Sequence, residues 1–146
     1  MDYSYILKQL PYGKTFLFVD ELLEVNDTSV RGRFTFKPEF DFYSGHFKNQ
    51  AVTPGVILTE CCAQIGVVCL GIFLLEGNKE GQMALTATEM EFYQPVFPAE
   101  TVEVVSKKIY FRFGKLKCNV RMYGSGDKLI CKGIISGMLK SRDRDE

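Results

Sequence analysis

Histidine is almost missing from this sequence, since His46 is the only one in 146 residues. The five cysteines form no C-x-x-C pair, and a metal site needs several cysteine or histidine ligands at close spacing. We therefore expect neither a metal nor a cofactor. Three of the cysteines fall in one apolar stretch, where free thiols behave as small hydrophobic side chains. A catalytic cysteine would have to use His46 as its partner.

The chain also has no net charge, because its eighteen basic and eighteen acidic residues cancel. A chain without an overall field does not attract nucleic acid or an anionic membrane, and neither is expected as a partner. The segment 1–5 lacks the basic and apolar regions of a signal peptide, so a cytoplasmic location is expected. No repeat or linker interrupts the chain, and residues 1–146 are expected to form a single domain with a frayed, charged tail at 140–146.

One long apolar run is present, at 56–75, and its twenty residues could cross a bilayer. Glu60 and Gln64 oppose that interpretation, since an acid inside a spanning helix costs about 2.5 to 3.5 kcal/mol. The run therefore predicts a helix buried inside a folded protein and not a membrane span. Thr53 is expected to cap this helix and Pro54 to be its first residue.

The rest of the chain predicts an antiparallel sheet. A short helix is expected at 3–10, and 39–50 is expected to be a loop rich in aromatic residues. Apolar and β-branched segments separated by turn residues predict six strands, at 16–25 (with a bend or bulge at Asp20-Glu21), 30–37, 83–93, 101–113, 116–123 and 129–139. One buried helix and about six strands give an α+β architecture in which the sheet wraps the helix.

The region around the histidine carries a spaced motif. Gly45-His46-Phe47 is followed by Pro54-Gly55-Val56, which begins eight residues after the histidine, and by Glu60 and Gln64 at fourteen and eighteen residues. This spacing resembles the active-site segment of the beta-hydroxyacyl-ACP dehydratases of fatty-acid synthesis, enzymes with the hot-dog fold. The resemblance covers residues 10–139 through further matches at Leu10-Pro11, Phe16-Leu17, Val19-Asp20, Phe92 and Gln94-Pro95-Val96-Phe97-Pro98.

Two positions depart from that family. Tyr12 stands where many members have a histidine, and Asn49-Gln50 stands where they often have Gly-His. Neither is a residue that the family uses for chemistry.

The resemblance implies a hydro-lyase that converts (3R)-3-hydroxyacyl-ACP to trans-2-enoyl-ACP in fatty-acid or a related acyl or polyene pathway. His46 would remove the proton next to the thioester carbonyl, since histidine acts as a base near neutral pH. Glu60, kept protonated by apolar surroundings, would donate to the leaving hydroxyl. The first-turn N–H groups of Gly55 and Val56 would stabilise the thioester oxygen, and Gln64 would support Glu60.

The resemblance also implies partners. The active site would lie at a homodimer interface, with the histidine from one subunit and the acid from the other, and the dimers could assemble further into a trimer of dimers. The substrate would be carried by an acidic acyl carrier protein on a phosphopantetheine arm. Candidate docking residues are Lys48 and Lys115, and candidate residues of an acyl tunnel are Tyr43, Phe47, Phe92 and Phe97.

Two alternatives stay open. A hot-dog acyl thioesterase would use Glu60 as nucleophile or base and could dispense with His46. A non-catalytic hot-dog subunit would bind acyl chains or serve as an obligate partner. For each single residue, a structural role is also open: Glu60 as a buried acid bonded to backbone, and the aromatic residues as core.

Overall fold

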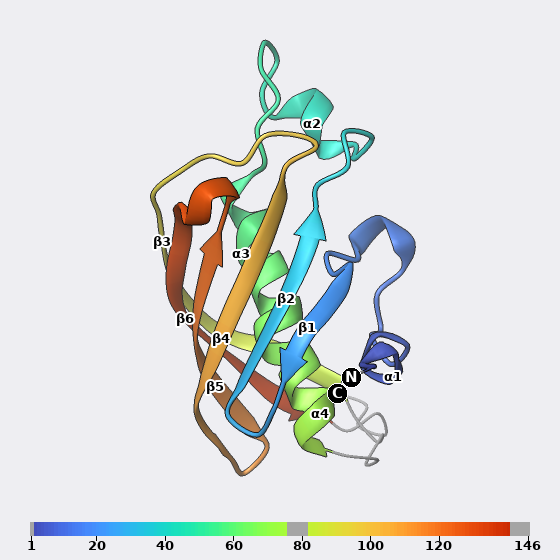
Figure 1. Cartoon of the computed structure of the whole chain (residues 1–146), viewed down its shortest axis with the longest axis vertical. Helices are drawn as coiled ribbons and strands as arrows, with labels where there is room; N and C mark the ends of the chain where they lie inside the picture. The colour runs from blue at the N-terminus through green and yellow to red at the C-terminus, as the bar shows by residue number, and fades with distance from the viewer. Residues whose placement is uncertain (1, 76–81, 141–146) are drawn as a thin grey trace.

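Six antiparallel strands form one sheet in the order β1-β2-β4-β5-β6-β3 (Figure 1). The computed structural model describes residues 2–75 and 82–140. Its strands are β1 (Glu21–Val25), β2 (Ser29–Thr35), β3 (Gln82–Phe92), β4 (Thr101–Arg112), β5 (Lys115–Tyr123) and β6 (Leu129–Lys140). Short helical turns are α1 (Ser4–Leu7), η1 (Lys14–Phe16), α2 (Phe42–Gly45) and η3 (Ser125–Asp127).

One helix runs behind β2 and β4 (Figure 1) and consists of α3 (Gly55–Ala63), a π-helical segment η2 (Gln64–Cys69) and α4 (Leu70–Leu75). All six residues of η2 are buried. The helix is long and apolar enough to cross a membrane, but 67% of its apolar window is buried inside the fold. The expected core helix is therefore confirmed.

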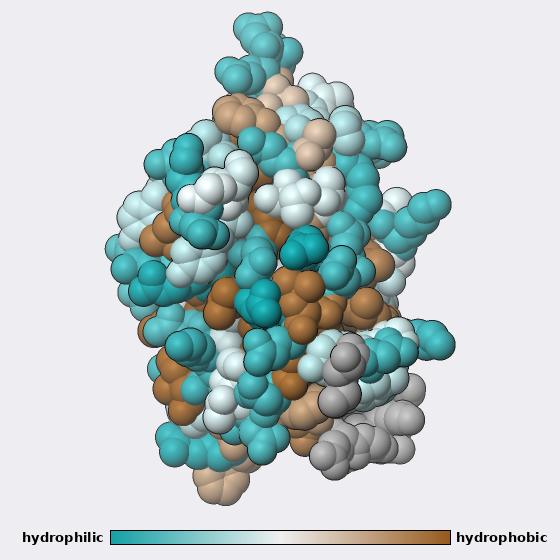
Figure 2. All heavy atoms as spheres, viewed as in Figure 1, coloured by the Kyte–Doolittle hydropathy of each residue, from teal (hydrophilic) through white to brown (hydrophobic). Residues whose placement is uncertain are grey.

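The strands pack on this helix through alternating residues, as a half-buried antiparallel sheet requires. In β4, Val102 and Val104 point to the helix and are buried, as is Ser106, whose hydroxyl donates to the Gly66 carbonyl over 2.9 Å. Gly66 allows a close approach of helix and sheet, since a β-carbon there would stand only 3.0 Å from Ser106 and from Val120. The opposite face of the sheet mixes hydrophilic and scattered apolar side chains (Figure 2). The α+β, hot-dog arrangement is confirmed.

The strand expected at 16–25 is wrong in its first half. Lys14–Phe16 is a 3-10 turn, and β1 begins only at Glu21. Phe18 is buried, but its N–H donates to the side chain of Gln64 over 2.8 Å, so a helix residue takes the place of a neighbouring strand. The irregularity in β1 lies between Leu22 and Glu24, not at the acidic pair 20–21.

The predicted helix start is wrong by one residue. Pro54 is extended (φ −60°, ψ 141°) and occupies the cap position, and Gly55 is the first helical residue. Thr53 does not cap the helix, because its hydroxyl is hydrogen-bonded to the Tyr43 hydroxyl.

Other boundaries shift slightly. The predicted loop 39–50 contains α2, the predicted turn at Gly114-Lys115 lies at 113–114, and the helix expected at 3–10 is reduced to α1. Lys140 belongs to β6, so the predicted tail is wrong at that position. The rest of the tail, 141–146, and the predicted polar break at 76–81 lie outside the described residues.

Candidate active site

His46 follows α2 and is half-buried. Its Nδ1 lies 2.9 Å from the carbonyl oxygen of Val52. A carbonyl can only accept a hydrogen bond, so Nδ1 carries the proton and donates. The neutral ring then keeps the lone pair of Nε2, and that nitrogen can act as a base. The ring also stacks on Phe47, with centroids 3.8 Å apart.

Backbone bonds hold the loop that carries the histidine. The N–H of Val52 donates back to the His46 carbonyl (2.9 Å), and that of Phe47 donates to the Gln50 carbonyl (2.7 Å). The N–H of Thr53 donates to the carbonyl of Val96 in the segment after β3 (2.8 Å). The imidazole is therefore positioned by backbone atoms at both ends of its loop.

Glu60 lies on α3, one turn before Gln64, and is half-buried. The Gln64 Nε2 donates to Glu60 Oε2 and to the Phe16 carbonyl, each over 3.0 Å, while Gln64 Oε1 accepts from the Phe18 N–H. Gln64 is completely buried, and a buried amide must satisfy its polar atoms within the fold. It fixes the carboxylate of Glu60 against the segment that precedes β1.

The N-terminus of α3 offers free donors. The first N–H groups of a helix have no partner within it, and Gly55 and Val56 stand in that position. A β-carbon on Gly55 would stand 3.4 Å from the ring of Phe92, so the backbone is approached closely there. Val56 is 77% exposed. This end of the helix can stabilise negative charge on an oxygen.

A cavity of about 190 Å³ lies beside Glu60. It is lined by helix residues, by Leu85 of β3, by Gly137 of β6 and by Tyr12 from the N-terminal segment. Burial, and after it the charge of Glu60, raise the pKa of the Tyr12 hydroxyl. Tyr12 was not among the predicted site residues. It lies forty-eight residues before Glu60, and no periodicity or spacing connects two such positions.

His46 does not line this cavity. Within the described part of the chain, no hydrogen bond joins His46 to Glu60, because the histidine is bonded to Val52 and the acid to Gln64. One chain therefore holds the predicted base and the predicted acid in separate surroundings.

The predicted tunnel residues are dispersed. Tyr43 is buried in the core, with its hydroxyl on Thr53. Phe47 is 57% exposed and Phe92 is 47% exposed, and Phe97 also lies at the surface. None of the four lines the cavity beside Glu60.

The two predicted docking lysines lie at opposite ends of the molecule. Lys48 is exposed and follows the histidine near the α2 end. Lys115 is the first residue of β5 and lies opposite Arg112 at the far end of β4. At about 3.3 Å per residue, β4 separates these ends by roughly 36 Å. In Figure 1, α2 lies at the top and the β4–β5 turn at the bottom.

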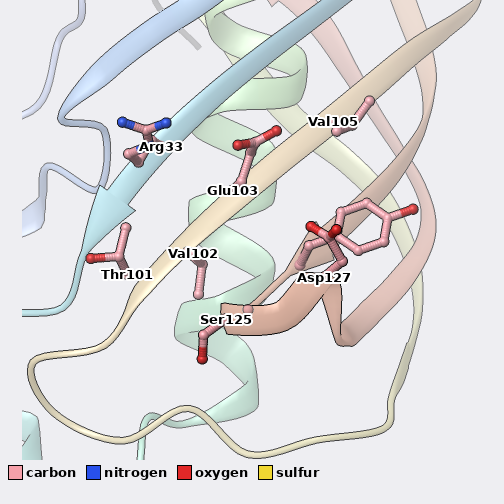
Figure 3. Close-up of a pocket in the computed structure, with 9 residues that line it drawn as sticks. Arg33, Thr101, Val102, Glu103, Val105, Ser125 and Asp127 are labelled. Atoms are coloured by element: carbon pink, nitrogen blue, oxygen red, sulfur yellow. The ribbon is translucent and has the colours of Figure 1, made fainter.

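A larger hollow, of about 450 Å³, lies on the outer face of the sheet (Figure 3). Arg33, Glu103 and Asp127 line it, with the helix behind the sheet. Arg33 is paired with Glu21, and Glu103 with Arg31. The charges of this hollow are largely engaged in ion pairs, and it contains neither His46 nor Glu60.

The five cysteines are all buried and unbridged, as predicted. Burial raises the pKa of the Cys61 and Cys69 thiols. Since the thiolate is the nucleophilic form, these cysteines are poorly suited to catalysis.

A six-stranded antiparallel sheet wrapped around one central helix is the hot-dog fold. The FabA-like domain family matches residues 10–132, and the chain belongs to this family. It is 30% identical to the 3-hydroxyacyl-[acyl-carrier-protein] dehydratase FabZ of Sinorhizobium medicae, over 97% of this chain and 92% of that protein. It is 32% identical to the FabZ of Thermus thermophilus, over 88% and 90% of the two chains.

Solved structures share the fold. The dehydratase heterocomplex ApeI:P from Xenorhabdus doucetiae aligns with a TM-score of 0.77 at 13% identity, over 94% of this chain and 91% of that one. The protein smu.793 from Streptococcus mutans, bound to acetyl CoA, aligns with a TM-score of 0.66 at 10% identity, over 92% and 98%. At these identities the likeness shows the hot-dog fold alone.

Proposed function

We propose that this chain is a hydro-lyase that dehydrates (3R)-3-hydroxyacyl thioesters of acyl carrier protein to trans-2-enoyl thioesters, in fatty-acid or related acyl biosynthesis. The proposal rests on two side chains of this fold. The Nδ1 of His46 is bonded to the Val52 carbonyl, which leaves the lone pair of Nε2 available as a base, and Glu60 is held on the central helix by Gln64. The FabZ relatives, named as dehydratases of this kind, support the same reaction.

The chemistry follows from three groups. Nε2 of His46 removes a proton from C2, and the electron pair forms the C2–C3 double bond as the C3 hydroxyl leaves. In its protonated form, Glu60 donates a proton to that hydroxyl, so that it leaves as water. The N–H groups of Gly55 and Val56 stabilise the thioester oxygen while it carries negative charge. Gln64 touches no reacting atom and acts as a positioning residue for Glu60.

The site is proposed to be shared between two subunits, because His46 and Glu60 have separate surroundings within one chain. β3 is an edge strand of eleven residues whose partner in the sheet is β6. Residues 85–89 are exposed, including the apolar Leu85. A long exposed edge favours pairing with another strand, and we expect β3 to pair with the same strand of a second copy.

A charge reversal tests this homodimer. Leu85→Glu would place a charge in the proposed interface and should convert the dimer to a monomer in sedimentation. Phe113→Glu is the matched control, since Phe113 is also exposed but lies at the β4–β5 turn. A wild-type monomer, or an unaffected Leu85→Glu dimer, would contradict the pairing.

The partner is proposed to be an acidic carrier protein, and the protein to be cytoplasmic. Lys48 lies two residues from His46, and Lys115 belongs to a basic group on the β4–β5 hairpin that also includes Lys107, Lys108, Arg112 and Lys117. Salt should weaken docking at whichever site is used, mainly through the association rate. Lys48→Glu and Lys115→Glu can be compared on carrier-bound and short pantetheine substrates. Unchanged salt dependence in both would exclude these lysines.

The function is tested by incubating the protein with a 3-hydroxyacyl carrier-protein thioester. An enoyl thioester supports the proposal. A free carrier thiol would instead indicate a thioesterase, and unchanged substrate a non-catalytic acyl-binding subunit. His46→Ala is the control, since a thioesterase can work without this histidine.

A further inference from the structure

The cavity beside Glu60 is lined mainly by apolar residues. Glu60 and Tyr12 supply its polar side chains, and the other lining residues, among them Val67, Val68 and Leu85, are apolar. An apolar cavity of about 150 Å³ holds a benzene molecule. A cavity of about 190 Å³ therefore has room for a short hydrocarbon.

The direction of the cavity follows the helix. Glu60 and Val67 are seven residues apart and share one helix face, a distance of roughly 10 Å at about 1.5 Å per residue. With C3 of the substrate at the carboxyl group of Glu60, the chain beyond C3 would run along this face toward Val67. Gly137 lies at the other wall, where a β-carbon would stand 3.0 Å from Val67, so the cavity is narrow there.

The amide that holds Glu60 also bonds the segment that follows Tyr12. Gln64 donates both to Glu60 and to the carbonyl of Phe16, and the ring of Phe16 lies 6.3 Å from that of Tyr12. The N–H of Phe16 in turn donates to the Gly13 carbonyl, next to Tyr12 in the chain. Tyr12 therefore lines the cavity beside Glu60 with a neutral side chain, whose hydroxyl pKa is raised by burial and by Glu60.

We infer that Tyr12 is a specificity-determining residue, whose ring closes one side of the cavity beside Glu60 and limits the length of the acyl chain beyond C3. The inference rests on the proposed function, and it assigns the chain-length limit to a residue of the N-terminal segment.

The test measures kcat/KM for 3-hydroxyacyl carrier-protein substrates with four, eight and sixteen carbons. Tyr12→Ala and Tyr12→Leu open the cavity and should raise the sixteen-to-eight-carbon ratio about tenfold or more, since single methylenes change rates by that order in apolar pockets. The change should appear mainly in KM for the long substrate. Tyr12→Phe keeps the ring and should keep the ratio. Tyr5→Ala removes an exposed tyrosine of the same segment and should also leave it unchanged.

The outcomes separate the two proposals. The inference would be overturned if the wild type converts the four-carbon substrate but Tyr12→Ala and Tyr12→Leu keep the sixteen-to-eight-carbon ratio within twofold of the wild-type ratio. That result would leave the dehydratase proposal intact. A wild type that converts none of the substrates would contradict the proposed function. In that case the dissociation constants of octyl and hexadecyl pantetheine thioethers test Tyr12 directly, and an unchanged ratio in both variants would overturn its role.

Discussion

Gln64 Nε2 lies 3.0 Å from the carboxylate oxygen of Glu60 and, equally, 3.0 Å from the carbonyl of Phe16. One buried amide thus connects the helix that bears the candidate acid to the segment that leads into β1. The helix is thereby fixed to the segment before β1 by this side chain.

Replacement of Gln64 by leucine should reduce both stability and activity. It leaves the Phe18 N–H and the Phe16 carbonyl without partners, and an unsatisfied buried group costs about 1 to 3 kcal/mol. It also releases Glu60, so kcat for dehydration should fall more than KM changes. Urea unfolding and steady-state kinetics measure the two effects.

Gln64→Glu distinguishes the contribution of Gln64 to stability from its positioning of Glu60. The new carboxylate can still accept from Phe18 but lies against Glu60, where two like charges repel. We expect a different pH profile of kcat from wild type. A wild-type profile and wild-type kcat in both variants would contradict a positioning role for Gln64.

The free energy of unfolding should fall in alkali. Burial holds the pKa of Cys61 and Cys69 above the usual 9.0, so in the folded state these thiols keep protons that the unfolded chain releases. The stabilisation is complete below pH 9 and is lost as the pH rises above it. The slope should approach about 1.4 kcal/mol per pH unit for each such thiol.

Urea unfolding in reducing buffer between pH 7.5 and 10 measures this slope. Cys69→Ala removes one contributing thiol and should make the decline shallower than in wild type. A wild-type free energy of unfolding that stays constant across the range would show that the thiols ionise equally in both states.

Gly66 should not tolerate a side chain. A β-carbon there meets Ser106 and Val120 at 3.0 Å, and overpacking of a close-packed core costs about 1 to 3 kcal/mol. Gly66→Ala should therefore lower the urea midpoint clearly. Gly13→Ala is the control, because a β-carbon at Gly13 meets nothing within 4 Å. Equal midpoints in the two variants would refute the close approach of helix and sheet.

The sequence predicted the elements better than their ends. The apolar run from Val56 onward and the alternation of β4 report burial directly, and both were confirmed. The segment at 16–20 looked like a strand because Phe18 is apolar and buried, but its backbone bonds to Gln64, and no local pattern reveals a side-chain partner forty-six residues away. The extended state of Pro54 was also missed.

The candidate site, too, could be predicted from the sequence only in part. The motif spacing predicted His46, Glu60 and Gln64 as site residues, and the observed Glu60–Gln64 bond follows from their separation of one helical turn. Tyr12 could not be found by spacing, because its proximity to Glu60 depends on how the N-terminal segment folds back over the helix.

The central claim is that His46 of one subunit works with Glu60 of another. His46→Ala and Glu60→Ala should each be folded and inactive in hydration of an enoyl thioester, the reverse reaction. In a mixed dimer, one site regains both residues and the other has neither. Mixing equal amounts under subunit exchange should therefore restore about a quarter of wild-type activity, since half of randomly assorted dimers are mixed and each has one working site. No recovery, with mixed dimers demonstrated by mass spectrometry, would contradict the shared site.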